Sequence, residues 1–384
     1  MKIRYLLGLL FMGLIGIIGC TDDSESLIPS KIDEYKPQLS EGNASYDAKI
    51  QKWYKNTGVS ILYKFEDREP YFNGSGEWGE CFVDTIITSN TYIVDDKDVY
   101  IKNNKVYVKD ANYPIGTTMN PDKNTWKLEV TVTGDTSVFV RKHRIIATEN
   151  AFTVKPAEEE YVEKQLTWIE EMFLNCYPDS LLRRGLPLKM LLGRELTYSQ
   201  SEYVKDQISK PYYYFFHNLI FNYGDESIDA LTDKQKNEIK VDLHCWFIME
   251  RISSSFNFEE FHAASDFSWL IEGQTTVAQV PAYDACYGMG FVKRPTWLFL
   301  TVAYANDLEA YIRMVLGNSL EKMETKPVNG KYNNGNYYSS TLDYTGILHP
   351  DKDVNGKIRT KYNLLLKEFE RLGIDLQRIG DLYN

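Results

Sequence analysis

The sequence predicts an α+β protein in which a mainly helical domain with a small sheet is interrupted by a β-rich insertion. Residues 67–153 alternate apolar and polar side chains and contain the turn signals "NN" and "TGDT", so they are assigned to strands. Apolar residues after Glu158 recur at helical spacing, and residues 45–66 and 154–384 are assigned to the main domain. Two short apolar runs within it, "LPLKMLLG" and "PYYYFFHNLIF", are typical of buried strands.

The N-terminus has the pattern of an export signal. Residues 1–19 combine a basic start with the apolar run "LLGLLFMGLIGII" and form a predicted signal peptide. The run ends in "IIGC", which matches the bacterial lipobox, in which a signal peptidase cuts before Cys20 and that thiol carries the lipid. An ordinary secretory signal or membrane anchor with a chance cysteine is the alternative.

Residues 20–44 are predicted to be the lipidated cysteine and a flexible stalk, because Ser, Pro, Lys and Glu dominate this stretch. The sequence "TDDSES" after Cys20 resembles the acidic tag of surface-exported lipoproteins in one group of Gram-negative bacteria. We therefore expect a lipid anchor in the outer membrane with the protein facing the cell exterior.

Composition excludes one class of partner. The 384 residues contain 43 Lys and Arg against 54 Asp and Glu, a formal charge of −11, which argues against nucleic acid. Cys81, Cys176, Cys245 and Cys286 show no CxxC spacing, so a structural zinc ribbon is not expected. Buried free thiols are favoured for these four cysteines, although an exported protein permits disulfides.

The main domain is predicted to begin with a helix at 45–58 and a strand at 59–65. Further helices are predicted at 158–177, at 231–256, within 295–317, and at 356–383 with a break at "LGID". Thr232 and Gln235 have capping-box spacing, so Thr232 is expected to cap the central helix. The aromatic run 212–216 is assigned to a buried strand, with an exposed aromatic platform as the alternative.

A family resemblance rests on the order of these pieces. The lipobox "IIGC" is followed by "WYKNTGVSILYKF", "VEKQLTWIEEMFLNCYPDSLL", "LPLKMLLG", the central helix, "GFVKRPTWLFLTVAYANDLEAYIRMVL" and "LKEFERLGIDLQRIGDL". Together they resemble the lipoprotein zinc metallohydrolases, also described as zinc-binding metallopeptidases, that are encoded beside outer-membrane nutrient importers. The resemblance covers most of the chain outside the insertion and implies a zincin-like fold.

Such a family carries an HExxH motif on its central helix, in which two histidines bind zinc and the glutamate is the general base. In the aligned stretch, His244 takes the place of the first histidine, Cys245 that of the glutamate, and Ile248 that of the second histidine. Arg251 stands where family members often carry another histidine. Because cysteine cannot replace the proton shuttle and isoleucine cannot bind zinc, no catalytic residue is assigned. His244 is expected to be a remnant metal ligand, buried and bonded to a carbonyl or side chain.

The family's later acidic motif corresponds best to "NDLEA", in which Asp307 survives while Asn306 and Ala310 replace the outer carboxylates and Glu309 is displaced. A rebuilt metal site is the alternative. Its candidate ligands are Cys245 on the central helix and four residues in the following stretch, which is assigned to a loop: Glu259, Glu260, His262 and Asp266. A nucleophilic pair of Cys245 and His262 is a further option.

The expected function is a surface-anchored lipoprotein that has lost catalysis and acts as a binding or accessory component of a TonB-dependent uptake system. No cofactor is expected, with zinc as the alternative, and the ligand would be a peptide or a glycan. Two rival functions remain open. One is an active metallohydrolase with a rebuilt site, and the other is a structural or adhesive lipoprotein that acts through residues 67–153.

Overall fold

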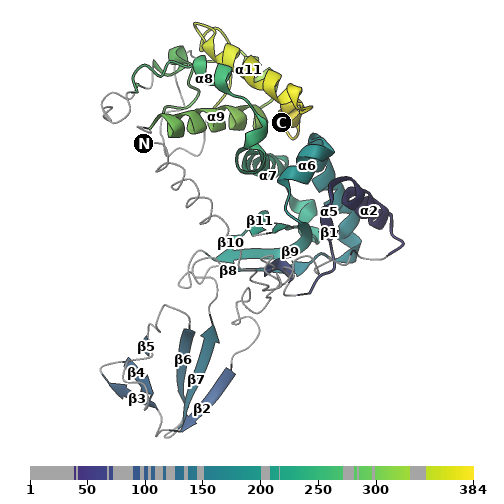
Figure 1. Cartoon of the computed structure of the whole chain (residues 1–384), viewed down its shortest axis with the longest axis vertical. Coiled ribbons are helices and arrows are strands. Elements are labelled where there is room, and N and C mark those ends of the chain that lie inside the picture. The colour runs from purple at the N-terminus through teal and green to yellow at the C-terminus, as the bar shows by residue number, and fades with distance from the viewer. Residues whose placement is uncertain are drawn as a thin grey trace, which may run out of the picture.

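The structure is a computed structural model of the whole chain, and helices and a mixed sheet make up most of what it describes (Figure 1). This mixture is compatible with the predicted α+β class. It describes residues 39, 42–66, 69–71, 151–199, 208–215, 217–270, 281–282, 285–295, 299–328 and 343–384, and the backbone of six strands between 90 and 144. Within these residues, no helix is both long and apolar enough to cross a membrane.

A six-stranded sheet organises the N-terminal part of the main domain. Strands β1 (Ser60–Leu62) and β12 (Asn218–Phe221) flank the first half of β9 (Lys189–Ser199), and all three run parallel. Strand β11 (Tyr212–Phe215) pairs antiparallel with β12 at the end of this path. The second half of β9 pairs antiparallel with β8 (Ala151–Pro156) and β10 (Ile208–Ser209).

Both faces of the sheet are apolar, and neighbouring side chains along each strand point to opposite faces. Ile61, Met190 and Leu219 belong to the large core under the helices. Their sequence neighbours Leu62 and Leu191 point to the opposite face, in a smaller cluster with Phe152, Leu196 and Ile220. The part "KMLLG" of the run "LPLKMLLG" therefore lies in a buried strand, as predicted, and the strand begins at Lys189.

Helices cover the first face of the sheet. They are α2 (Ser45–Thr57), α5 (Glu159–Met172) and α6 (Asp179–Gly185), with a short 3-10 turn, η3 (Leu174–Cys176), after α5. The buried amide of Gln165 on α5 donates to the carbonyl oxygens of Gly193 (3.0 Å) and Asn222 (2.7 Å). These bonds attach the helix to strand β9 and to the end of β12.

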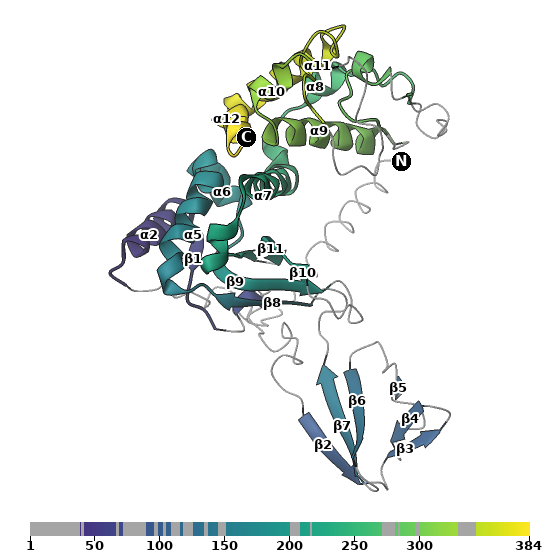
Figure 2. The same ribbon diagram turned by 180° about the vertical axis from the view of Figure 1, so that it is seen from behind.

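The C-terminal part of the chain is helical. The central helix α7 (Asp233–Trp246) begins with the predicted capping box, because Thr232 Oγ1 accepts from the backbone N–H of Gln235 and the Gln235 side chain accepts from the N–H of Thr232. In both views α7 lies between the sheet and the remaining helices (Figure 2). Those helices are α8 (Glu259–Ala263), α9 (Leu300–Leu316), α10 (Leu320–Glu324), α11 (Lys357–Arg371) and α12 (Leu376–Asp381).

Short helical turns join these elements. The predicted central helix continues past α7, but as one π-helical turn, η5 (Phe247–Arg251), in which the N–H of Ile252 bonds to the carbonyl of Phe247. The others are 3-10 turns: η2 (Glu69–Tyr71), η4 (Glu226–Ala230), η6 (Ser253–Ser255) and η9 (Tyr287–Met289).

The predicted β-rich segment contains two small antiparallel sheets. Their strands are β2 (Asn90–Asp95), β6 (Trp126–Thr133) and β7 (Ser137–Arg144), in the order β2-β7-β6, and β3 (Val99–Lys102), β4 (Lys105–Val108) and β5 (Gly116–Thr117). Both views show them beyond the six-stranded sheet, on the side away from α7.

Three sequence-based assignments need correction. Strand β8 spans the predicted boundary at residue 153 and pairs with β9, so the segment 151–156 belongs to the main sheet. Strand β11, which holds most of the aromatic run, is only half-buried because it lies at the end of the strand order, and the buried strand is β12, which follows the run. The loop expected around Glu259 is helix α8.

Candidate functional site

His244 on α7 is fully buried and both of its ring nitrogens are hydrogen-bonded. Nε2 lies 2.7 Å from the carbonyl oxygen of Met172, and Nδ1 lies 2.6 Å from the hydroxyl of Tyr177. Since a carbonyl only accepts, Nε2 carries the hydrogen and Nδ1 accepts from Tyr177. The prediction of a buried histidine bonded to a carbonyl or side chain is confirmed.

The surroundings of this imidazole are apolar. The ring of Tyr177 stacks on it at 5.4 Å, that of Phe173 meets it edge-on at the same distance, and Phe247 packs on Tyr177 at 4.8 Å. Burial lowers the pKa of His244 to about 3, against a smaller upward effect of its bond to Met172. The imidazole is therefore neutral at physiological pH, and both of its nitrogens are occupied by hydrogen bonds within the protein.

The neighbours of His244 do not complete a metal site. The thiol of Cys245 is buried, and burial raises its pKa to about 12. Ile248 is fully buried in the large core. Arg251 donates from Nε to the carbonyl oxygen of Gly185 (2.9 Å) and from Nη1 to the hydroxyl of Tyr214 (3.3 Å).

Asp307, the surviving residue of the acidic motif, belongs to a different cluster. Its Oδ2 lies 2.5 Å from Nζ of the fully buried Lys361 and 3.2 Å from the hydroxyl of Ser265. The Lys361 ammonium also donates to the carbonyl oxygen of Gly290 and lies 4.1 Å from the ring centroid of Tyr311. His244 thus bonds toward α5, Asp307 bonds toward α11, and the structure does not bring them together.

The candidates for a rebuilt site do not converge either. His262 stacks on Tyr304 at 4.3 Å, and Asp266 Oδ1 accepts from the backbone N–H of Ser268. Glu259 and Glu260 are exposed on α8, and among the described residues no three His, Cys, Asp or Glu side chains gather in ligand geometry. The charged residues that affect the pKa of Cys245 are Arg313, Glu309, Asp242 and Glu250, and His262 is not among them. Zinc does not fit the residues that the resemblance implies.

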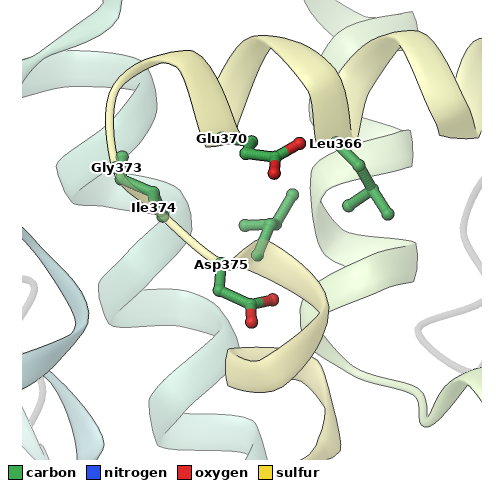
Figure 3. Close-up of a pocket in the computed structure, with 6 residues that line it drawn as sticks. Leu366, Glu370, Gly373, Ile374 and Asp375 are labelled. Atoms are coloured by element: carbon green, nitrogen blue, oxygen red, sulfur yellow. The ribbon is translucent and has the colours of Figure 1, made fainter.

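A hollow of about 360 Å³ lies where α11 ends and α12 begins (Figure 3). Its two carboxylates, Glu370 and Asp375, lie on opposite sides of it in Figure 3. Asp375 Oδ1 already accepts from the backbone N–H of Arg378 and caps α12. The rest of the lining is aliphatic or backbone: Leu366, Gly373, Ile374 and Leu376. One free carboxylate against an apolar wall is a poor basis for a metal site.

Two tyrosines of the run that was assigned to a buried strand are instead partly exposed. Tyr212 and Tyr214 project from the same face of β11 toward Trp246 on α7, with ring centroids 6.5 Å and 5.1 Å from that of Trp246. Arg251 lies with its guanidinium carbon 5.2 Å from the ring centroid of Tyr214. We call Tyr212, Tyr214, Trp246 and Arg251 the aromatic shelf. The alternation within "YYYF" was the available signal, because its other two rings, Tyr213 and Phe215, pack on Phe152 across the sheet.

The comparisons with known proteins add no name. No family model, no curated protein and no solved structure matches the chain. The predicted lipidation site Cys20 and the fourth remaining cysteine, Cys81, lie outside the described residues. Cys176 and Cys245 are buried free thiols, as predicted, and Cys286 is buried as well.

Proposed function

We propose that this chain is a lipoprotein anchored through Cys20 on the outside of the outer membrane, and that it serves a TonB-dependent uptake system as a non-catalytic binding component. The observation that carries the proposal is the pairing of His244. A histidine that could hold a catalytic metal needs a free ring nitrogen that faces a cavity. Both ring nitrogens of His244 are hydrogen-bonded, to Met172 and to Tyr177, and aromatic rings pack around the imidazole.

Two further observations support the loss of peptidase chemistry. The position of the general base holds Cys245, whose thiol remains protonated at physiological pH because burial raises its pKa. The position of the second histidine holds Ile248, which fills the core. The same part of α7 still has a partly exposed aromatic edge, and this edge is the structural basis for a binding role.

Metal analysis of the purified mature protein tests the loss of catalysis. We expect no stoichiometric zinc in the wild type, in His244→Ala, or in the control His349→Ala, whose histidine is partly exposed. We also expect no peptide hydrolysis that a chelator abolishes. One zinc per chain that His244→Ala removes and His349→Ala retains would contradict the proposal.

The anchor is tested separately in cells. Metabolic labelling with a fatty acid should mark the wild-type protein and fail to mark Cys20→Ala. A protease added to intact cells should digest the wild-type protein if it faces the exterior. An unlabelled wild-type protein, or one protected in intact cells and digested after lysis, would contradict the anchor or its orientation.

A further inference from the structure

We propose that the aromatic shelf binds an uncharged carbohydrate chain, which gives the proposed binding component its ligand class. The inference rests on the proposed function only for the biological role of that binding. The site itself is argued from the shelf residues Tyr212, Tyr214, Trp246 and Arg251.

Part of the ring surface of the aromatic shelf remains exposed to solvent. Tyr212, Tyr214 and Trp246 are each partly exposed, and the Trp246 ring is tilted by 47° to Tyr212 and 43° to Tyr214. The rings of Tyr212 and Tyr214 therefore meet that of Trp246 at an angle and do not stack face to face on it. Sugar rings present apolar C–H faces that pack on such aromatic surfaces, and Tyr and Trp provide large contact area at a low cost in side-chain entropy.

The rings are also rigidly supported. Trp246 lies at the end of α7 with its ring next to that of Phe247, 6.3 Å away, and Phe247 is fully buried. Arg251 is held by Gly185 and lies over the ring of Tyr214. A surface that is already ordered before binding does not lose further conformational entropy when a ligand arrives.

Polar groups at the shelf are free to bond with hydroxyls. Within the described part of the chain, the indole N–H of Trp246 and the hydroxyl of Tyr212 make no hydrogen bond. The hydroxyl of Tyr212 is largely buried, which raises its pKa. The second guanidinium nitrogen of Arg251, Nη2, makes no hydrogen bond there either. Glu250 is exposed next to Arg251 and provides an acceptor. A few polar groups among aromatic rings are what a small-molecule site requires.

The charges around the shelf favour an uncharged ligand. Arg313 is already paired, through Nη1 with Asp242 and through Nε with Glu309, both at 2.7 Å. Arg251 and the exposed Glu250 carry opposite charges at adjacent positions of η5. The carboxylates Asp242, Glu250 and Glu309 outnumber the cations Arg251 and Arg313, which disfavours a polyanion. An apolar helix or acyl chain would desolvate the donors of Trp246 and Tyr212 without replacing their bonds to water.

Affinity electrophoresis of the mature protein tests the site. Native gels would contain dextran, laminarin, galactomannan or arabinoxylan, with polygalacturonate as the anionic comparison. We expect at least one of the four neutral polysaccharides to retard the wild type and polygalacturonate to have no effect. Trp246→Ala and Tyr212→Ala should each weaken the retardation constant by about tenfold, the order of one lost aromatic contact.

Two controls keep the result interpretable. Tyr54→Ala removes a 45% exposed tyrosine from α2, outside the shelf, and should leave the retardation unchanged. Trp246→Phe keeps a ring at the site but lacks the indole N–H, so it should weaken binding less than Trp246→Ala even if the alanine variant unfolds more easily.

The proposal is overturned if none of the four neutral polysaccharides retards the protein. It is also overturned if retardation is the same in Trp246→Phe, Tyr212→Ala and wild type, or if only polygalacturonate or an added peptide digest binds. Zinc content measured on the same samples keeps the two proposals apart, because a zinc-free protein that binds no sugar refutes the shelf alone.

Discussion

The hydroxyl of Tyr177 lies 2.6 Å from Nδ1 of His244 and donates to it, because the carbonyl oxygen of Met172 holds the ring hydrogen on Nε2. The two residues are 67 positions apart in the sequence. With the bond from Nε2 to Met172, this contact ties the central helix α7 to the end of α5 and the turn that follows it. His244 is therefore a structural connection between the sheet-bound helices and the C-terminal helices.

Tyr177→Phe should destabilise the protein by about 1–3 kcal/mol, because it leaves Nδ1 of His244 buried without a donor. Urea unfolding followed by circular dichroism measures the change. Tyr161→Phe is the matched control, since the hydroxyl of Tyr161 has no hydrogen-bond partner among the described residues. Equal effects of the two substitutions would show that the bond to His244 adds nothing.

Stability should fall in acid because His244 is buried in its neutral form. Burial lowers its pKa from 6.5 to about 3, so between these values the unfolded state binds the extra proton. The contribution is present above pH 6.5 and should be lost as pH falls toward 3, by roughly 1.4 kcal/mol per pH unit. Urea unfolding of wild type and His244→Gln from pH 7 to 4 measures it. Parallel pH profiles for the two proteins would contradict the assignment.

The buried pair of Lys361 and Asp307 should be strongly coupled. Lys361→Met leaves a carboxylate buried without its partner and should cost about 3–5 kcal/mol. Adding Asp307→Asn should recover part of that loss, and a double-mutant cycle by urea unfolding gives the coupling energy. The exposed pair of Lys64 and Glu159 is the control and should show little coupling. If the effects of the two substitutions on the free energy of unfolding are additive, the ion pair contributes nothing to stability and the prediction is wrong.

The thiol of Cys245 should be unreactive in the folded protein. Burial raises the pKa of Cys245 to about 12 and that of Cys176 to about 11, and only the thiolate attacks a disulfide reagent. In a background with Cys20 and Cys81 replaced by serine, modification by Ellman's reagent should be at least ~100-fold slower in buffer than in urea. Fast native labelling of position 245 would instead support a reactive cysteine.

Local structure was predictable wherever neighbours in the sequence decide it. Thr232 and Gln235 lie three residues apart and cap α7 as expected, and the helical spacing after Glu158 marks α5. The break at "LGID" separates α11 from α12, with Gly373 at a φ of +78°, where glycine is favoured. These features follow from backbone geometry over a single turn.

Features that depend on distant partners were not predictable. Strand β8 begins within the predicted insertion but pairs with β9, a strand that follows it by about 40 residues and sets its register. The half-exposure of Tyr212 and Tyr214 depends on the place of β11 at the end of the strand order. The sequence shows an aromatic run in either case.

The sequence by itself determined the longer helices, the cap at Thr232, the apolar strands and the absence of histidine and glutamate from the aligned positions 248 and 245. Only the tertiary structure decided that His244 bonds to Tyr177 and that Asp307 bonds to Lys361, so that the two residues serve separate clusters. The reason is that helical periodicity acts over a few residues. The partner, burial and pKa of a side chain are set by elements that approach from elsewhere in the chain.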